Sequence, residues 1–444
     1  MLRFSPGLSE KKVRDLSAIK NEPKWMLDIR LKAYKQFVEM PLPNFGPDLS
    51  FLDFQKICYY AQPTEKTTSS WKNLPKEIRE VYDKIGLPEA EKQYLGGVGA
   101  QYNSEIVYQN LKNKWDNLGV IFLDTDTALK KYPDIFQEYF GKIIASNDNK
   151  FAALNTAMWS GGSFIYVPRG VRLTIPLQAY FRINIANLGQ FERTLIIADE
   201  DSEIHYVEGC TAPIYSVDSL HAAVVEVVAK RNSRVRYTTI QNWSTNVVNL
   251  TTQRMLVEEN AIGEWIDGNI GSKITMKYPS VVLNGNGARG DILSLAIARN
   301  GQIQDNGGKA IHLAENTSSN IVSKSVSLDG GICSYRGKIA IENEAKNAKT
   351  STQCDALLMD DLSVSNTFPR NSIKRNDASI AHEASVSRVS EEQLFYIMSR
   401  GIPENEALSM IVNGFVEPIV KNIPLEYAAE LNRLIDLDME GSVG

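Results

Sequence analysis

The chain has 444 residues, of which 43% are hydrophobic and 23% are charged. This composition is that of a globular protein and excludes wholesale disorder, while the ~150-residue prior for one domain predicts two or three domains. The 53 acidic and 48 basic residues give a net charge of −5, which argues against nucleic acid or an anionic membrane as the main partner. No apolar stretch approaches ~18 residues and no signal sequence follows Met1, so we expect a cytoplasmic protein that does not cross a membrane.

Residues 1–160 are predicted to form an N-terminal helical region. Ser9 is a candidate N-cap for the first helix. Pro23, Pro75 and Pro133 each fit the first turn of a further helix, where the missing N–H of proline carries no penalty.

Residues 161–384 show a different pattern, in which short β-branched runs are separated by turn clusters such as Asn306–Gly308 and Asp329–Gly331. Amphipathic helical windows are almost absent, which excludes βαβ units and leaves a sandwich, a barrel or a β-solenoid. A stretch of 384 − 160 = 224 residues fits a solenoid best, because a solenoid grows by stacking coils. No strict repeat is visible, so the coils must be irregular. The clearest predicted strands are Phe164–Val167, Thr194–Ile197, Val224–Val228, Arg234–Ile240, Ile292–Ile297 and Ile321–Ser323.

Residues 385–444 are predicted to form a C-terminal helical domain. Ser390 begins the first helix with a capping box, and Pro403 begins a second helix that Gly414 is expected to end. A last helix is expected to start at Pro424.

Common nucleotide-binding motifs are absent from the sequence. Lys309 follows two glycines, but Ala310 comes next and the first glycine of a phosphate loop is missing. The chain therefore has no ATPase motif of its own.

Cys354 and the pair His382-Glu383 are candidate metal ligands. Cys354 and Glu383 are 383 − 354 = 29 residues apart, close to one or two turns of a solenoid whose repeats run ~20–45 residues. A thiolate, an imidazole and a carboxylate in one small volume suit a transition metal. The residues alone leave the structural interpretation open, since a lone cysteine is also a common core residue.

Cys210 lies where a predicted strand enters a Gly- and Pro-containing turn, and both a structural and a reactive role are open for it. Two sets of polar residues also recur at every second position, which places each set on one face of a strand. If these faces are internal they line a polar conduit, and if they are external they carry no function. The two sets are Arg182 with Asn184, and Thr239, Gln241 and Trp243.

From about Leu95 onward the chain resembles the SufB/SufD family, which provides scaffold subunits of the SUF iron–sulfur cluster assembly machinery. The resemblance is carried by several motifs in the right order: Gly96–Tyr102, Glu208–Pro213, Asn366–Pro369, His382–Ala384, Glu391–Tyr396 and Met439–Gly444.

This resemblance implies a mainly β protein, with a right-handed parallel β-helix core flanked by N-terminal and C-terminal α-helical regions. It implies a scaffold for de novo cluster assembly rather than a turnover enzyme. The implied partners are the ATPase SufC, docked on the C-terminal helices, and SufD or a second SufB, paired through the β-helix. It further implies iron, sulfur from a cysteine desulfurase pathway, a nascent cluster of the 4Fe-4S type and, as an open alternative, reduced flavin at the level of the complex.

The resemblance also implies roles for individual residues. Cys210 matches the cysteine that accepts persulfide sulfur, Cys354 the cysteine at the cluster site and Glu383 its companion carboxylate, with His382 beside them. The polar residues between the two cysteines match a sulfur path: Arg182, Asn184, Thr239, Gln241 and Trp243.

Two departures from the family pattern are visible. Many relatives have Glu where this chain has Ala381, so a third carboxylate is lost. Gln253 replaces a basic residue, which puts a cationic path residue in doubt.

The number of cysteines limits how a cluster is held. A stable cubane takes four thiolates, and cysteines as scattered as 58, 210, 333 and 354 do not converge easily. An incomplete ligand set suits a cluster that is built and then released. The competing interpretations are a β-helix polysaccharide-acting enzyme, which requires export and clustered acids, and a purely structural interaction scaffold in which Cys354 is inert.

Overall fold

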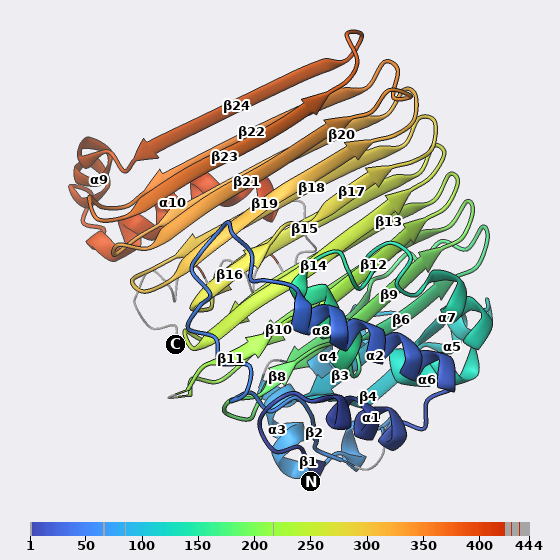
Figure 1. Ribbon diagram of the computed structural model, residues 1–444. Helices are drawn as coiled ribbons and strands as arrows, with labels where there is room; N and C mark the ends of the chain where they lie inside the picture. The colour runs from blue at the N-terminus through green and yellow to red at the C-terminus, as the bar shows by residue number, and fades with distance from the viewer. Residues whose placement is uncertain are drawn as a thin grey trace.

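The protein is described here by a computed structural model covering residues 2–64, 67–84, 86–215, 217–421, 428 and 435. It is mainly β and contains a parallel β-solenoid of about eight turns, with helices near both ends of the chain (Figure 1). The expected β-helix core with helical flanks is confirmed.

Two sheets form the walls of the solenoid, and each coil adds one strand or more to each wall. The first wall has the order β24-β22-β20-β18-β15-β13-β10-β7-β3-β4. Its solenoid strands are β7 (Leu177–Arg182), β10 (Glu203–Thr211), β13 (Arg234–Trp243), β15 (Ile262–Gly271), β18 (Arg289–Ala298), β20 (Ser318–Ser327), β22 (Lys349–Leu358) and β24 (Ser379–Arg388).

The second wall runs β23-β21-β19-β16-β14-β12-β9-β6-β5, with β8, β11 and β17 attached beside this path. Its solenoid strands are β6 (Ser163–Val167), β8 (Gly189–Gln190), β9 (Arg193–Ala198), β11 (Ser219–His221), β12 (Val224–Ala229), β14 (Val247–Val257), β16 (Ile274–Lys277), β17 (Ser280–Leu283), β19 (Ile303–His312), β21 (Ile332–Ile341) and β23 (Val364–Ile373).

Asparagine and aspartate mark one corner of successive coils. Asp201, Asn232, Asn260, Asn316 and Asn347 all have positive φ, a conformation that these residue types adopt more readily than most. The side-chain amides of some of these residues bond to the corner one coil earlier, as from Asn347 Nδ2 to Asn316 Oδ1 at 3.2 Å. These hydrogen-bonded corners recur from coil to coil and are the irregular repeat of the solenoid.

The turn expected at Asn306–Gly308 is wrong, because these residues lie inside β19. The two glycines have no Cβ and so allow neighbouring coils to pack closely at this point. A Cβ on Gly307 would lie 1.8 Å from the backbone oxygen of Arg336, and one on Gly308 would lie 2.9 Å from the Ile321 side chain.

The N-terminal region closes one end of the solenoid with helices and a hairpin. The helices expected from Ser9, Pro23, Pro75 and Pro133 are present, and the Ser9 side chain caps the first of them. The elements are β1 (Leu2–Arg3), α1 (Glu10–Ile19), α2 (Lys24–Glu39), β2 (Ala61–Gln62), the 3-10 helix Trp71–Asn73, α3 (Lys76–Lys84), α4 (Leu87–Gln93), β3 (Gly97–Tyr102), β4 (Glu105–Leu111), α5 (Asn113–Asp116), β5 (Ile121–Asp124), α6 (Thr125–Lys131), α7 (Pro133–Tyr139) and α8 (Lys150–Met158).

The strands β3, β4 and β5 are a departure from the expected helical region. The hairpin β3–β4 joins the first wall through parallel pairing of β3 with β7, and β5 pairs antiparallel with β6. Every residue of β3 is buried. These strands therefore cover the end of the solenoid at its first coil, which is called the covered end.

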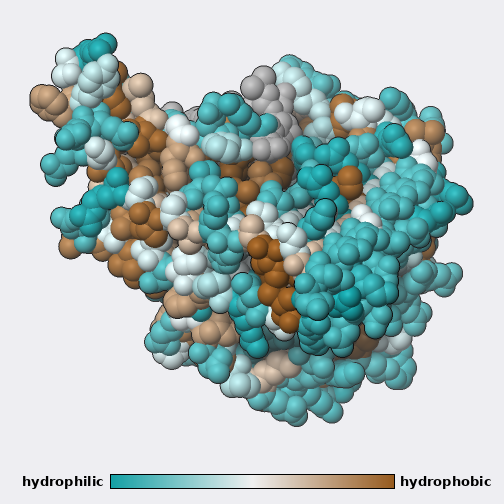
Figure 2. All heavy atoms as spheres, turned by 90° about the horizontal axis from the view of Figure 1, so that it is seen from above, coloured by the Kyte–Doolittle hydropathy of each residue, from teal (hydrophilic) through white to brown (hydrophobic). Residues whose placement is uncertain are grey.

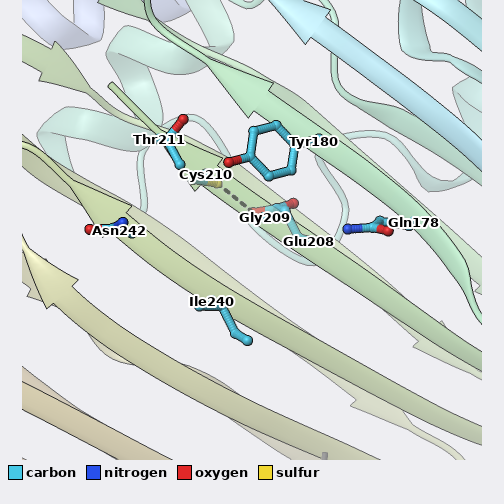
Figure 3. Close-up of a pocket in the computed structure, with 8 residues that line it drawn as sticks. All are labelled: Gln178, Tyr180, Glu208, Gly209, Cys210, Thr211, Ile240 and Asn242. Atoms are coloured by element: carbon cyan, nitrogen blue, oxygen red, sulfur yellow. Dashed lines mark hydrogen bonds between the residues drawn. The ribbon is translucent and has the colours of Figure 1, made fainter. Parts of the chain in front are cut away.

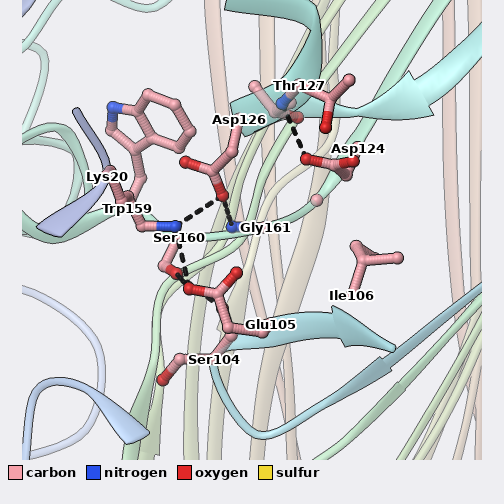
Figure 4. Close-up of polar contacts among 12 residues, drawn as sticks. Lys20, Ser104, Glu105, Ile106, Asp124, Asp126, Thr127, Trp159, Ser160 and Gly161 are labelled. Carbon is pink, nitrogen blue, oxygen red and sulfur yellow. Dashed lines mark hydrogen bonds and ion pairs between the residues drawn. The ribbon is translucent and has the colours of Figure 1, made fainter. Parts of the chain in front are cut away.

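A buried lysine ties α1 to this covered end (Figure 4). Lys20, the C-cap of α1, has its Nζ 2.9 Å from Glu105 Oε1 and 2.6 Å from Asp126 Oδ2. Asp126 also accepts a 2.9 Å hydrogen bond from the backbone N–H of Gly161. One ammonium thus holds three segments that are distant in sequence.

The C-terminal helices are α9 (Glu391–Met398) and α10 (Glu404–Val420). Ser390 caps α9 as expected, but α10 continues through Gly414. Nothing lies within 4 Å of a Cβ built on Gly414, and burial of Val412 and Val416 against the solenoid outweighs the ~1 kcal/mol that an interior glycine costs a helix. The helix expected from Pro424 lies outside the described residues.

Candidate functional site

A single column of polar side chains runs along the interior of the first wall. The parallel strands are in register, so each side chain lies directly over its neighbour one coil away. Adjacent strands are about 4.8 Å apart, so the five steps of the column span about 24 Å. All six side chains are buried: Glu208, Thr239, Asp267, Ser294, Ser323 and Cys354.

The opposite wall supplies further polar groups to the same interior. Lys277 on β16 and Asp267 on β15 form an ion pair in which both side chains are almost completely buried. An interior of this kind is unusual, because buried polar atoms are normally hydrogen-bonded, yet the Thr239 and Ser294 hydroxyls have no partner among the described residues. The column therefore provides a polar lane inside the solenoid.

Cys210 lies at the covered end of this lane, on β10 (Figure 3). Its Sγ is 3.6 Å from Glu208 Oε1 on the same face of the strand, and its exposed fraction is 1%. Burial, together with Glu208 and Glu192, raises the pKa of the Cys210 thiol well above its usual value. The thiol is thus protonated and enclosed in this conformation.

Two buried carboxylates surround Cys210. Glu208 accepts a hydrogen bond from the Tyr237 hydroxyl, and burial beside Glu192 raises the pKa of Glu208 to about 7. Glu192 is paired with the imidazole of His221. Burial would lower the pKa of His221, but the Glu192 carboxylate raises it overall.

Cys354 lies at the other end of the lane, on β22, and is 5% exposed. Its Sγ is 3.9 Å from Nε2 of His382, which projects from the neighbouring strand β24. Burial raises the pKa of the Cys354 thiol to about 12, partly offset by the Tyr335 hydroxyl from the opposite wall. A thiol and an imidazole are therefore within reach of one metal ion.

Glu383 does not join this pair within one chain, so the expectation that its carboxylate shares one small volume with Cys354 is wrong. Cys354 pairs in register with Ala384, one residue beyond Glu383. Side chains alternate between the two faces of a strand, so a spacing of 29 places Glu383 on the outer face, where it is exposed beside Gln353.

The expected sulfur path divides between the two faces of the first wall. Thr239, Gln241 and Trp243 face the interior, in the same alternation as Glu208 and Cys210. Arg182 pairs with Thr211 and donates a 2.9 Å hydrogen bond to its hydroxyl on the outer face. An interior position for Arg182 is therefore wrong, and Asn184 lies beyond the end of β7.

Several interior polar residues were not singled out from the sequence. Their signal is weak, because they are scattered along the chain and only the register of the coils brings them together. They are Glu192, Glu208, His221, Asn249, Asp267, Lys277 and Tyr335. Gln253 also faces this interior, on β14, and neither atom of its amide has a partner among the described residues. Gln253 is neutral where a basic residue was expected, and Lys277 supplies a positive charge to the same interior.

The solenoid is open at its last coil, formed by β23 and β24. These strands are the ends of the two walls. Ile373 and Val386 lie in register with buried interior residues, yet they are 43% and 58% exposed. Figure 2 views the molecule from above, the side of β24 in Figure 1, and shows hydrophobic residues among hydrophilic ones.

Comparison with known proteins identifies a family. Residues 98–179 match the SufBD protein N-terminal region, and residues 181–415 match the SufBD core domain of SUF system FeS cluster assembly. The chain is 57% identical over all 444 residues to the iron–sulfur cluster assembly protein SufB of Bacillus subtilis, covering 96% of that protein. It is 56% identical, with the same coverage, to SufBD family proteins of Staphylococcus saprophyticus and Staphylococcus aureus. No described helix is both long and apolar enough to span a bilayer.

Proposed function

The chain belongs to the SufB/SufD family of iron–sulfur cluster assembly proteins, and on that premise we propose that it is a scaffold that receives sulfur at Cys210 and builds a cluster at Cys354. It works in the cytoplasm, with residues 1–160 as the closed end, 161–384 as the sulfur-conducting core and 385–444 as a docking domain. What carries the proposal is the unbroken buried polar column between the two cysteine sites.

Sulfur from a cysteine desulfurase pathway forms a persulfide at Cys210. The thiol is buried, and its raised pKa disfavours the nucleophilic thiolate, so acceptance requires an opening movement. The chain has no phosphate loop, and the ATPase SufC is the partner proposed to drive that movement.

SufC docks on the C-terminal helices. Phe395 and Tyr396 of α9 are 74% and 60% exposed. The groove between α9 and α10 is lined by Tyr396, Ile397 and Met410, among others. Large exposed aromatic and methionine side chains are enriched at the cores of protein interfaces.

Sulfur then travels about 24 Å along the column to Cys354. A direct exchange between the two cysteines is excluded by this distance, so the sulfane sulfur must leave Cys210 as hydrosulfide. That reduction takes two electrons, and reduced flavin at the level of the complex is the proposed donor.

The cluster is assembled on Cys354 and His382 with ligands from a second subunit. The open last coil supports pairing with SufD or a second SufB, since exposed interior side chains such as Val386 gain from being covered. Glu383 is exposed on the outer face of the edge strand β24, where it is available to a cluster at that interface.

Anaerobic incubation of the chain with ferrous iron and sulfide tests the proposal. A brown protein with bound iron and sulfide is expected, and Mössbauer spectroscopy identifies the 4Fe-4S type. A colourless protein would contradict the proposal and favour a purely structural interaction scaffold.

A further inference from the structure

A second set of metal-ligating groups lies at the closed end of the lane. Ligand atoms of Glu192, Glu208 and Cys210 all lie within 4.8 Å of one another, and the three side chains are at most 1% exposed. They come from two coils that are adjacent in the solenoid. His221 contacts the same group through its bond to Glu192.

Unpartnered buried oxygens point to a missing occupant of this set. Glu192 Oε2 has no hydrogen-bond partner among the described residues, although Glu192 is completely buried. The hydroxyl of Thr239, in register beside Glu208, is unpartnered as well. A buried polar atom without a partner costs about 1–3 kcal/mol, so a ligand that satisfies these oxygens would bind favourably.

The charge balance favours a cation. Two carboxylates face each other here, and His221 is the cationic group paired with one of them. The buried Lys277, which also faces this interior, is already paired with Asp267. A divalent ion would neutralise both carboxylates at once, which protonation of one of them does only in part.

The donor set defines the class of ion. Carboxylate oxygens together with one thiolate suit a divalent first-row transition metal such as Fe²⁺, and do not suit Mg²⁺ or Ca²⁺, which prefer oxygen ligands alone. We propose that Glu192, Glu208 and Cys210 bind one divalent transition-metal ion, Fe²⁺ among the candidates, at a site separate from Cys354. The Cys210 sulfur–metal bond replaces the S–H bond, the proton leaves to solvent, and no oxidation state changes.

This site would link iron to sulfur acceptance. A metal bound to Cys210 blocks persulfide formation there, because the same sulfur atom is needed for both bonds. The inference goes beyond the proposed function and does not depend on cluster assembly at Cys354.

Anaerobic titration of the full-length chain with Co²⁺ tests the site, since thiolate-ligated cobalt has a charge-transfer absorbance. The parent is Cys354→Ala, which removes the other proposed metal site. We expect one thiolate-bound cobalt per chain in this parent, loss of the band on adding Cys210→Ala, and affinity weakened by roughly 10- to 100-fold on adding Glu192→Gln. A band that survives Cys210→Ala, or no band in the parent, would overturn the site.

A second measurement, made on the unmutated chain, tests the site even if one of the variants fails to fold. In the unmutated chain, bound cobalt should slow alkylation of Cys210 by about tenfold or more, as mapped by mass spectrometry, and leave the equally buried Cys333 unchanged. Equal slowing at both cysteines, or none at Cys210, would contradict metal binding here. Cluster reconstitution at Cys354 is measured separately, so failure of one proposal leaves the other testable.

Discussion

Cys354 Sγ lies 3.9 Å from Nε2 of His382, whereas Glu383, one residue further along β24, is exposed on the opposite face. The register explains both positions, because Cys354 pairs with Ala384. Only residues of β24 that are an even number of positions from Ala384 face the same side as Cys354. The imidazole, rather than the carboxylate, is thus the companion of the thiol within one chain.

Substitution of His382 should therefore weaken metal binding in the isolated chain. We expect His382→Ala to lower the affinity of Cys354 for ferrous iron by roughly 10- to 100-fold, since one of two ligands is lost. Gln353→Ala is the matched control, because Gln353 lies on the outer face beside Glu383. Anaerobic iron titration followed by absorbance measures both, and equal affinities in the two variants would contradict the pairing.

A bulky apolar side chain in the polar column should block sulfur transfer. Ser294 lies midway between Glu208 and Cys354 and is buried. We expect Ser294→Val to leave persulfide formation at Cys210 intact and to abolish sulfide incorporation at Cys354, at a stability cost of about 1–3 kcal/mol for overpacking. Ser294→Ala, which adds no bulk, should transfer sulfur normally. Mass spectrometry of labelled sulfur at each cysteine distinguishes the two, and undiminished transfer in Ser294→Val would rule out the column as the route.

A charge at the open last coil should disrupt pairing with a second subunit. Val386 is 58% exposed although it faces the interior of the solenoid. We expect Val386→Asp to weaken association with SufD or a second SufB at least tenfold, because a carboxylate would be buried in the interface without a partner. Val38→Asp, on α2 with 60% exposure, serves as the control. Sedimentation analysis of the complexes reports the difference, and equal association of both variants would place the interface elsewhere.

The ion pairs of Lys20 should dominate the stability of the closed end. Lys20→Met leaves Glu105 and Asp126 without their cation in a largely buried site, so we expect a loss of about 3–5 kcal/mol in the free energy of unfolding. Lys24→Met breaks an exposed pair with Asp28 and should cost less than about 1 kcal/mol. Urea denaturation measures both, and similar costs would mean that the buried network contributes little.

The sequence predicted the architecture because its signals are local. Short β-branched runs excluded βαβ units, and proline and serine marked the starts of α1, α2, α3 and α7. The hairpin β3–β4 was missed because its burial depends on pairing with β7, which is distant in sequence. Gly414 was misread as a helix end for the same reason, since contacts with the solenoid extend α10 beyond it.

The candidate site was harder to predict because it depends on register. Spacing alone placed Cys354 near His382 and Glu383, but the choice between them needs the coil length to within one residue. The inward direction of Thr239 and the outward direction of Arg182 likewise follow from the pairing of β7, β10 and β13. No local pattern carries that information.

Cluster reconstitution in two matched cysteine variants tests the central claim most directly. Cys354→Ala and Cys333→Ala each remove one buried thiol from the solenoid, and circular dichroism checks that both remain folded. After anaerobic incubation with iron and sulfide, we predict bound iron and sulfide in Cys333→Ala equal to the unmutated chain. In Cys354→Ala we predict no bound sulfide and at most the one iron of the separate site at Cys210. Full cluster assembly in a folded Cys354→Ala protein would contradict the account.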